Sequence, residues 1–150
     1  LHLRDVALTF GGQPLPPLSA TVAIMTTAII LFAHGARDPE WAAPIRRIQS
    51  AIRERAPALA VDLAFLEFMT PDLRACAAGL IADGARRIVV QPMFIAQGGH
   101  LKKELPVLVE NLRSNWPDVE FLLDRAIGED DGVIAAMAEA ALCRTGATFA

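Results

Sequence analysis

Apolar runs alternate with amphipathic stretches along most of this chain of 150 residues. Short continuous apolar runs, rich in β-branched side chains, are typical of strands that are buried on both faces of a sheet. We therefore expect strands at residues 27–33, 60–68, 87–95 and 119–123. Between these runs, apolar residues recur every three or four positions, which predicts helices that pack one side against a sheet.

Capping signals mark where the first two helices begin. Asp38 precedes Pro39, which favours a helix with the aspartate as N-cap and the proline in its first turn. An apolar stripe at helical spacing follows, and we expect it to be core: Trp41, Ile45, Ile48 and Ile52. The segment Thr70-Pro71-Asp72 repeats the signal, and Gly84 is expected to end the second helix.

Two further helices complete the pattern. The third is expected over residues 101–114, where Pro106 predicts a kink or a separate first turn because proline lacks a backbone N–H. The last is expected over residues 132–143, with Asp130 or Asp131 as its N-cap. Each predicted strand is thus followed by a helix.

This alternation predicts an α/β domain built on a parallel sheet with right-handed crossovers. Four strands and four helices fit a flavodoxin-like domain with helices on both faces and strand order 2-1-3-4. Strands one and three are neighbours in that order, and the chain winds in opposite directions from them. Their carboxyl ends form the crevice where such folds bind ligands.

The first 24 residues do not follow this pattern. A single strand is expected within residues 1–10, and the turn-rich segment 11–17 then breaks regular structure. Regular patterning begins near Met25. We therefore expect residues 1–24 to be an extension outside the domain, residues 25–150 to form the domain, and Met25 to be the natural start.

Composition excludes several classes of protein. Hydrophobic residues make up 53% of the chain and charged residues 21%, which is typical of a globular domain. The net charge of −3 leaves no general basic surface for nucleic acid. No apolar run reaches the roughly 18 residues of a membrane span, and we expect neither a signal peptide nor an anchor. Cys76 and Cys143 form no CxxC motif, so we expect buried, reduced thiols in a cytoplasmic protein.

Two histidines are placed where such a fold keeps its chemistry. His34 follows the first predicted strand, and His100 comes after the glycine turn that follows the third. The predicted strand order makes the two imidazoles face each other across the crevice. Two neutral imidazoles suit a first-row divalent metal ion. Because two ligands leave coordination positions open, the pair suits a metal that is handed on rather than a structural metal.

Glu67 lies at the carboxyl end of the second predicted strand, among apolar neighbours. It is a candidate third ligand or base for the site, and the alternative is a carboxylate that simply points to solvent. A neutral imidazole or this carboxylate can accept a proton from a substrate.

Basic residues and glycines surround the two histidines in the sequence. Arg37, Lys102 and Lys103 are candidates for a basic rim that binds a substrate with several carboxylates, or they are merely solvated helix starts. Gly98 and Gly99 allow a flat ligand to approach the backbone closely.

The motifs that carry these residues resemble one known family. They are Leu31-Phe32-Ala33-His34-Gly35-Ala36-Arg37-Asp38, Phe65-Leu66-Glu67, Pro92-Met93-Phe94 and Gly98-Gly99-His100-Leu101-Lys102-Lys103-Glu104-Leu105-Pro106. Over about residues 27–142 the chain resembles the small CbiX/SirB-type chelatases. The resemblance implies insertion of Co²⁺, or alternatively Fe²⁺, into sirohydrochlorin on the way to cobalamin or siroheme, without ATP.

The resemblance also implies roles for residues and a partner. His34 and His100 match the metal-binding histidines of the family, and Glu67 matches a site acid less securely. No cofactor is implied beyond the metal ion that is the substrate. Because larger relatives carry two such domains in one chain, the resemblance implies a homodimer with the two clefts facing each other.

Other readings of the histidine pair stay open. A histidine phosphatase also begins with a strand and His-Gly, but it needs an arginine where this chain has Ala33. A metal-binding or metal-delivery module would use the same pair without a macrocycle, and a flavodoxin-like binding module would bind no metal. The basic rim favours the chelatase over both. Two histidines do not distinguish cobalt from iron or nickel.

Overall fold

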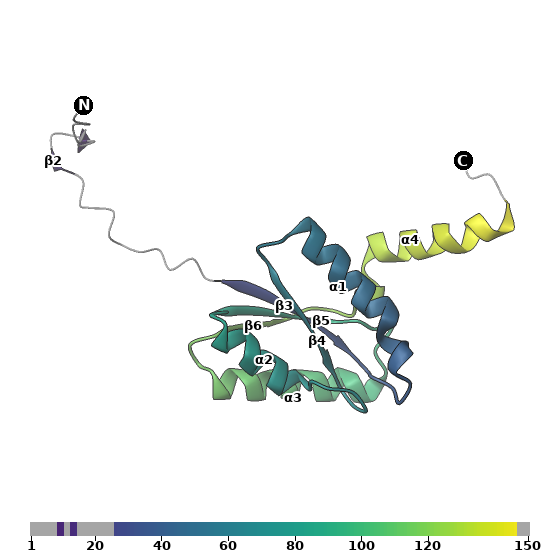
Figure 1. Cartoon of the computed structure of the whole chain (residues 1–150), viewed down its shortest axis with the longest axis horizontal. Coiled ribbons are helices and arrows are strands. Elements are labelled where there is room, and N and C mark those ends of the chain that lie inside the picture. Colours follow the sequence, from purple (N-terminus) through teal and green to yellow (C-terminus); the bar gives the residue numbers. More distant parts are fainter. Residues whose placement is uncertain (1–8, 11–12, 15–25, 147–150) are drawn as a thin grey trace.

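The structure, a computed structural model, describes residues 9–10, 13–14 and 26–146 (Figure 1). Two short strands, β1 (Thr9–Phe10) and β2 (Gln13–Pro14), pair antiparallel within the segment expected to precede the domain. The rest of the single strand expected over residues 1–10 lies outside the described residues. Within the described part of the chain, no helix combines the length and apolarity needed to cross a membrane.

Four parallel strands form the sheet at the centre of the domain (Figure 1). They are β3 (Thr27–Ala33), β4 (Ala60–Phe65), β5 (Arg87–Pro92) and β6 (Glu120–Leu123). Their order is β4-β3-β5-β6, which is the predicted order 2-1-3-4. The predicted fold class is therefore confirmed.

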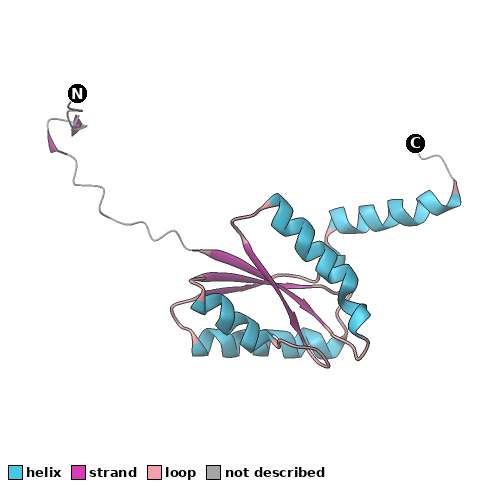
Figure 2. Cartoon of the chain, viewed as in Figure 1, coloured by secondary structure: helices cyan, strands magenta, loops and turns pink. Residues whose placement is uncertain are grey.

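Helices cover the two faces of this sheet unequally (Figure 2). The helices α2 (Leu73–Ala82) and α3 (Gly99–Asn115) pack on one face, and α1 (Ala43–Arg55) packs on the other. β3 is apolar throughout because Ile30 and Phe32 enter the core under α2 and α3, whereas Leu31 and Ala33 enter the core under α1. This double burial explains why its sequence reads as an unbroken apolar run.

Two strands end earlier than the sequence predicts. β4 ends at Phe65 instead of residue 68, and β5 ends at Pro92 instead of residue 95. The first difference arises because Phe68 has φ 62° and lies in a sharp turn, where the chain cannot stay extended. Beyond the strand ends, Phe94 is buried and Leu66 and Met93 pack partly against the core, and hydropathy alone does not distinguish this from a longer strand.

The first helical segment begins as predicted but is less buried than expected. Asp38 caps a 3₁₀ turn, η1 (Pro39–Ala42), by accepting a hydrogen bond from the Glu40 N–H, and α1 follows. The prediction of a core stripe is wrong for Trp41 and Ile48, which are 40% and 41% exposed. α1 has no fully buried residue. Its residues Ile48 and Ile52 line an open groove over this face of the sheet.

The third helix is continuous. Pro106 lies inside α3, which runs unbroken from Gly99 to Asn115, so the predicted separate first turn is wrong. The proline is exposed, whereas Leu105, Val109 and Leu112 are buried against the sheet. The packing of these side chains outweighs the loss of one helical hydrogen bond.

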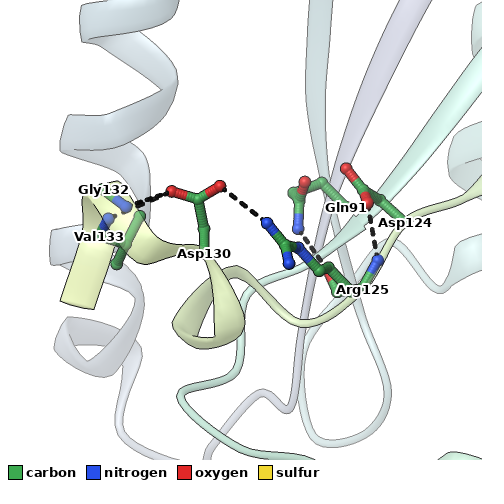
Figure 3. Close-up of polar contacts among 6 residues, drawn as sticks. All are labelled: Gln91, Asp124, Arg125, Asp130, Gly132 and Val133. Atoms are coloured by element: carbon green, nitrogen blue, oxygen red, sulfur yellow. Dashed lines mark hydrogen bonds and ion pairs between the residues drawn. The ribbon is translucent and has the colours of Figure 1, made fainter.

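The last helix leaves the body of the domain (Figure 1). Asp130 accepts hydrogen bonds from the Val133 and Gly132 N–H groups (Figure 3), and these bonds lower the pKa of its carboxyl group. After the 3₁₀ turn η2 (Ile127–Glu129), α4 (Asp131–Leu142) starts from this cap and η3 (Cys143–Thr145) follows it. The predicted cap is confirmed, yet no residue of α4 is buried.

The two cysteines differ in environment. Cys76 lies in α2 and is buried, and this burial, with the nearby Asp62 and Asp72 carboxylates, raises the pKa of its thiol to about 12. Cys143 is exposed, so the expectation of a buried thiol is wrong there. Cys143 belongs to η3, which follows α4, and α4 stands away from the sheet (Figure 1). The local sequence did not predict this placement.

We predict that a maleimide at pH 8 modifies one thiol per folded chain, Cys143. Cys76 stays protonated and shielded, because both burial and its raised pKa disfavour the reactive thiolate. Mass spectrometry should find one adduct on the folded protein and two after denaturation. The variant Cys143→Ser should take up reagent only when unfolded, and rapid labelling of two thiols in the folded chain would contradict the prediction.

Candidate functional site

A cleft of about 490 Å³ opens where three neighbouring strands end. Its lining consists of His34, Leu66, Glu67, Gly98, His100, Leu101 and Glu104. His34 follows β3, and Leu66 and Glu67 follow β4. β5 leads through a loop to the start of α3, which supplies the remaining lining residues. The strand ends are level because Ala33 pairs with Phe65 and Phe32 pairs with Pro92. The cleft therefore lies at the predicted switch point of the sheet.

His34 is exposed to the cleft but rests on the core. Its ring lies 4.6 Å from the ring of Phe94 between centroids, at an interplanar angle of 49°. Phe94 is buried and meets Phe32 edge to face at 6.1 Å. Such aromatic pairs prefer defined geometries. The imidazole thus packs against Phe94, which in turn packs against Phe32, and His34 lines the cleft.

The glycine after this histidine is required by a close contact. Gly35 has φ +84°, a conformation that L side chains rarely adopt. A Cβ atom at Gly35 would overlap the backbone oxygen of Glu67. The Glu67 N–H also donates to the His34 carbonyl oxygen at 3.0 Å. The chain leaving β3 therefore touches the chain leaving β4, and this contact brings His34 and Glu67 to one cleft.

Glu67 lies in a strained turn. The Met69 N–H donates to the Glu67 carbonyl oxygen at 2.8 Å, and Phe68 between them has φ 62°. A positive φ is uncommon for a bulky residue, and such conformations concentrate at functional sites. The exposed Phe68 ring lies under the Arg37 guanidinium, with 5.2 Å from its carbon to the ring centroid. This cation–π contact holds Arg37 beside the turn.

α3 supplies the opposite wall of the cleft. Gly98 is its N-cap residue, and His100 and Glu104 follow one helical turn apart. Residues at this spacing share a helix face, and both side chains line the cleft. Leu101 is buried between the cleft and the core. Sequence reasoning missed Glu104, although its i, i+4 spacing from a candidate histidine was the signal that pointed to it.

The predicted basic rim is not part of the lining. Arg37, Lys102 and Lys103 are exposed and lie outside the residues that line the cleft, as does Gly99. The structure brings together His34, Glu67, Gly98 and His100 of the predicted set, and adds a second carboxylate. The charged groups nearest to the cleft are therefore acids, which suit a cation and the acceptance of protons.

The cleft is an open site. Over residues 26–146 and the two short strands, no group of three or more His, Cys, Asp or Glu side chains is arranged to hold a metal ion. Structural zinc sites are closed by four ligands, which this arrangement does not resemble. Any metal ion bound by the histidine pair must complete its coordination with water or with a second molecule.

A family model and curated relatives relate this chain to the same group of proteins. The CbiX family model matches residues 28–142. A sirohydrochlorin cobaltochelatase of Priestia megaterium is 30% identical over 102 residues, which are 67% of this chain and 33% of that protein. One from Methanocaldococcus jannaschii is 25% identical over 131 residues, covering 71% of this chain and 92% of that protein.

Solved structures have the same fold. The cobalamin biosynthesis CbiX protein of Marinobacter aquaeolei VT8 superposes with a TM-score of 0.71 at 25% identity, covering 80% of this chain and 98% of that one. SirB of Bacillus subtilis subspecies spizizenii, solved in complex with cobalt, gives 0.67 at 23% identity, and the match covers 77% of this chain and 49% of SirB. This chain thus spans about half of SirB and one third of the Priestia protein.

We predict that Gly35→Ala disrupts both the fold and the cleft. The added Cβ overlaps backbone at Glu67 and the left-handed φ is strained, so the free energy of unfolding should fall by at least about 1–2 kcal/mol. Urea denaturation measures this loss. Gly79→Ala is the matched control, because Gly79 lies in α2 with open space around it and alanine there should stabilise the helix. Equal stability of both variants would contradict the prediction.

Proposed function

Because the chain belongs to the CbiX family, we propose that it inserts a divalent metal ion into sirohydrochlorin. The observation that carries the proposal is that two imidazoles and two carboxylates line one open cleft at the switch point of the sheet. Several relatives are named sirohydrochlorin cobaltochelatase. Cobalt is accordingly the proposed metal, with Fe²⁺ as the alternative, since imidazole accepts both.

The metal ion, as substrate, binds to the two histidines. His34 comes from the end of β3 and His100 from the first turn of α3, so the ligands are held by separate, packed elements. The ion keeps open coordination positions toward the mouth of the cleft. Two ligands hold it weakly enough for transfer to a tetrapyrrole that offers four nitrogens.

The carboxylates accept the protons that metal insertion releases. Two pyrrole N–H protons must leave as one divalent ion enters, so the exchange conserves charge in the macrocycle. Glu67 and Glu104 line the same cleft as the histidines and are the proposed acceptors. No nucleotide or further cofactor enters this scheme.

The macrocycle lies across the mouth of the cleft. Gly98 and Gly99 present backbone without side chains at the start of α3, where a Cβ atom added to either glycine would meet nothing within 4 Å. Arg37, Lys102 and Lys103 are exposed around the cleft and are proposed to bind the substrate carboxylates. The product then leads to cobalamin or to siroheme. A homodimer in the cytoplasm is the proposed form of the protein.

A second candidate is a metal-delivery module without a macrocycle. It is favoured by the acidic lining, since the basic residues expected to bind a carboxylated substrate lie outside the cleft lining. This module would bind cobalt through the same histidines. It differs from the chelatase in leaving the visible spectrum of a tetrapyrrole unchanged.

We predict that the chain converts sirohydrochlorin and Co²⁺ to the cobalt complex faster than the uncatalysed reaction, as followed by visible absorption. His34→Ala and His100→Ala should each lower the initial rate at least about tenfold, because one metal ligand is lost. His2→Ala is the matched control, since it removes an imidazole outside the expected domain. Parental rates in both site variants would overturn the assignment, and metal binding without any spectral change would favour delivery.

We predict that Glu67→Gln and Glu104→Gln lower kcat about 100-fold if each accepts a proton, with little change in KM for the metal ion. A role as a metal ligand would instead raise that KM. Glu110→Gln is the control on the same helix, because Glu110 is exposed and its 3.2 Å ion pair with Arg113 contributes little. Unchanged kcat in both site variants would remove the carboxylates from the mechanism.

A further inference from the structure

Phe68 combines a strained backbone with an exposed aromatic side chain. It lies at the centre of a tight turn, which is closed by the 2.8 Å hydrogen bond from the Met69 N–H to the Glu67 carbonyl oxygen. Within the described residues, Phe68 is the only residue other than glycine with a positive φ, 62°. A three-residue turn with a positive φ at its centre is rare and strained. Glycine would adopt this backbone without the strain.

The side chain of Phe68 contributes little to the core. The residue is 58% exposed, and over residues 26–146 no other phenylalanine or tryptophan is exposed to this extent. It belongs to neither of the two core clusters. An exposed phenylalanine forgoes the free energy that its burial would supply. The stability of the fold therefore explains neither the backbone conformation nor the aromatic side chain at this position.

The neighbouring exit from the sheet uses the residue that a left-handed backbone favours. Gly35 has φ +84° directly after β3 and His34, and glycine there avoids both strain and a clash with the Glu67 oxygen. At Phe68 a bulky residue holds the same kind of conformation instead. Strained residues of this sort cluster at active sites and ligand clamps. The contrast between the two exits indicates that the Phe68 ring serves a ligand.

The exposed ring of Phe68 holds a cation. The guanidinium carbon of Arg37 lies 5.2 Å from the centroid of the ring. No ion pair among the described residues includes Arg37. The planar guanidinium carries five N–H donors and can bind one carboxylate through two of them. Arg37 is thus positioned by an aromatic ring while its charge is left for an anion.

Phe68 and Arg37 stand beside the cleft of the proposed metal site. Phe68 directly follows Glu67, which lines the cleft. Arg37 comes three residues after His34, which also lines it. Neither Phe68 nor Arg37 belongs to the lining itself. A ligand that meets this pair must therefore extend beyond the space that a metal ion needs.

We propose that Phe68 and Arg37 form one recognition element for the macrocycle, a proposal that rests on the function proposed above. The Phe68 ring packs against the flat tetrapyrrole, and Arg37, positioned by that ring, binds a carboxylate at its periphery. Aromatic rings favour defined contacts with other flat π systems, and arginine favours bidentate contacts with carboxylates. The element orients the macrocycle over His34 and Glu67 without supplying a metal ligand. Phe68 is thus a substrate-binding residue that lowers the stability of the fold.

The first experiment measures stability without any ligand. Phe68→Gly relieves the strained backbone and Phe68→Ala does not, so the urea midpoint of the glycine variant should be higher by about 0.5 M and no lower than that of the parent. Val107 is the control position, because it is equally exposed, at 58%, but lies inside α3. There the order should reverse, since glycine is a poorer helix former than alanine. A midpoint for Phe68→Gly below that of Phe68→Ala or of the parent would make Phe68 structural and overturn the proposal.

The second experiment measures the equilibrium binding of sirohydrochlorin by visible absorption, with a chelator present so that no metal ion is inserted. Phe68→Ala and Phe68→Gly should each raise the Kd at least about tenfold, because both lack the ring. Phe68→Tyr keeps the ring and should stay within about twofold of the parent. Val107→Ala should bind as the parent does. Parental affinity in Phe68→Gly would overturn the proposal, as would equal losses in Phe68→Tyr and Phe68→Ala or a parent chain that binds no macrocycle.

A double-mutant cycle tests whether the ring positions Arg37. Arg37→Gln should raise the Kd about tenfold, because a charged contact to a carboxylate is lost. Combined with Phe68→Ala, it should raise the Kd by less than the product of the two single effects, since removal of the ring already displaces the guanidinium. A full product of the two effects would overturn the positioning of Arg37 by Phe68.

The binding data are separable from the chelatase activity. A parent chain that inserts no metal ion, while its Phe68 variants still lose affinity for sirohydrochlorin, would refute the chelatase and support the recognition element. A parent chain that inserts cobalt, while Phe68→Gly binds sirohydrochlorin as tightly as the parent, would overturn the recognition element alone.

Discussion

The burial of β3 on both faces and its pairing on both sides is the constraint on which the rest of the structure depends. Its side chains enter two different cores, so the strand cannot shift by one residue without exchanging them. The same register holds its end level with Phe65 of β4 and Pro92 of β5. The cleft exists because these three strands end together, and His34 is the residue at which the central strand enters it.

The site depends on close backbone packing as much as on its side chains. Gly35 and Glu67 touch where the chain leaves β3 and β4, and only a glycine fits that contact. The strained turn at Phe68 then directs the chain back toward α2. Rigid exits from the sheet position one histidine and one acid, while α3 holds the other histidine and acid on a single helix face. Four polar residues from these elements thus line one cleft.

The two faces of the sheet differ in how completely helices cover them. The face under α2 and α3 is sealed and supplies most of the core, whereas the face under α1 is left open over β5. Phe94 connects these features, since it contacts Phe32 in the core and His34 in the cleft and also lines the open groove.

The sequence by itself determined the strand order, the cap at Asp38, and the meeting of His34 with His100 at one cleft. These features follow from local patterns, because periodicity reports burial and parallel strands share one carboxyl edge. Only the tertiary structure decided that β4 stops at Phe65, that Glu104 lines the cleft, that Cys143 is exposed, and that α4 stands away from the sheet (Figure 2). The physical reason is that an apolar helix has the same local signature whether it covers its own sheet or is free to cover another.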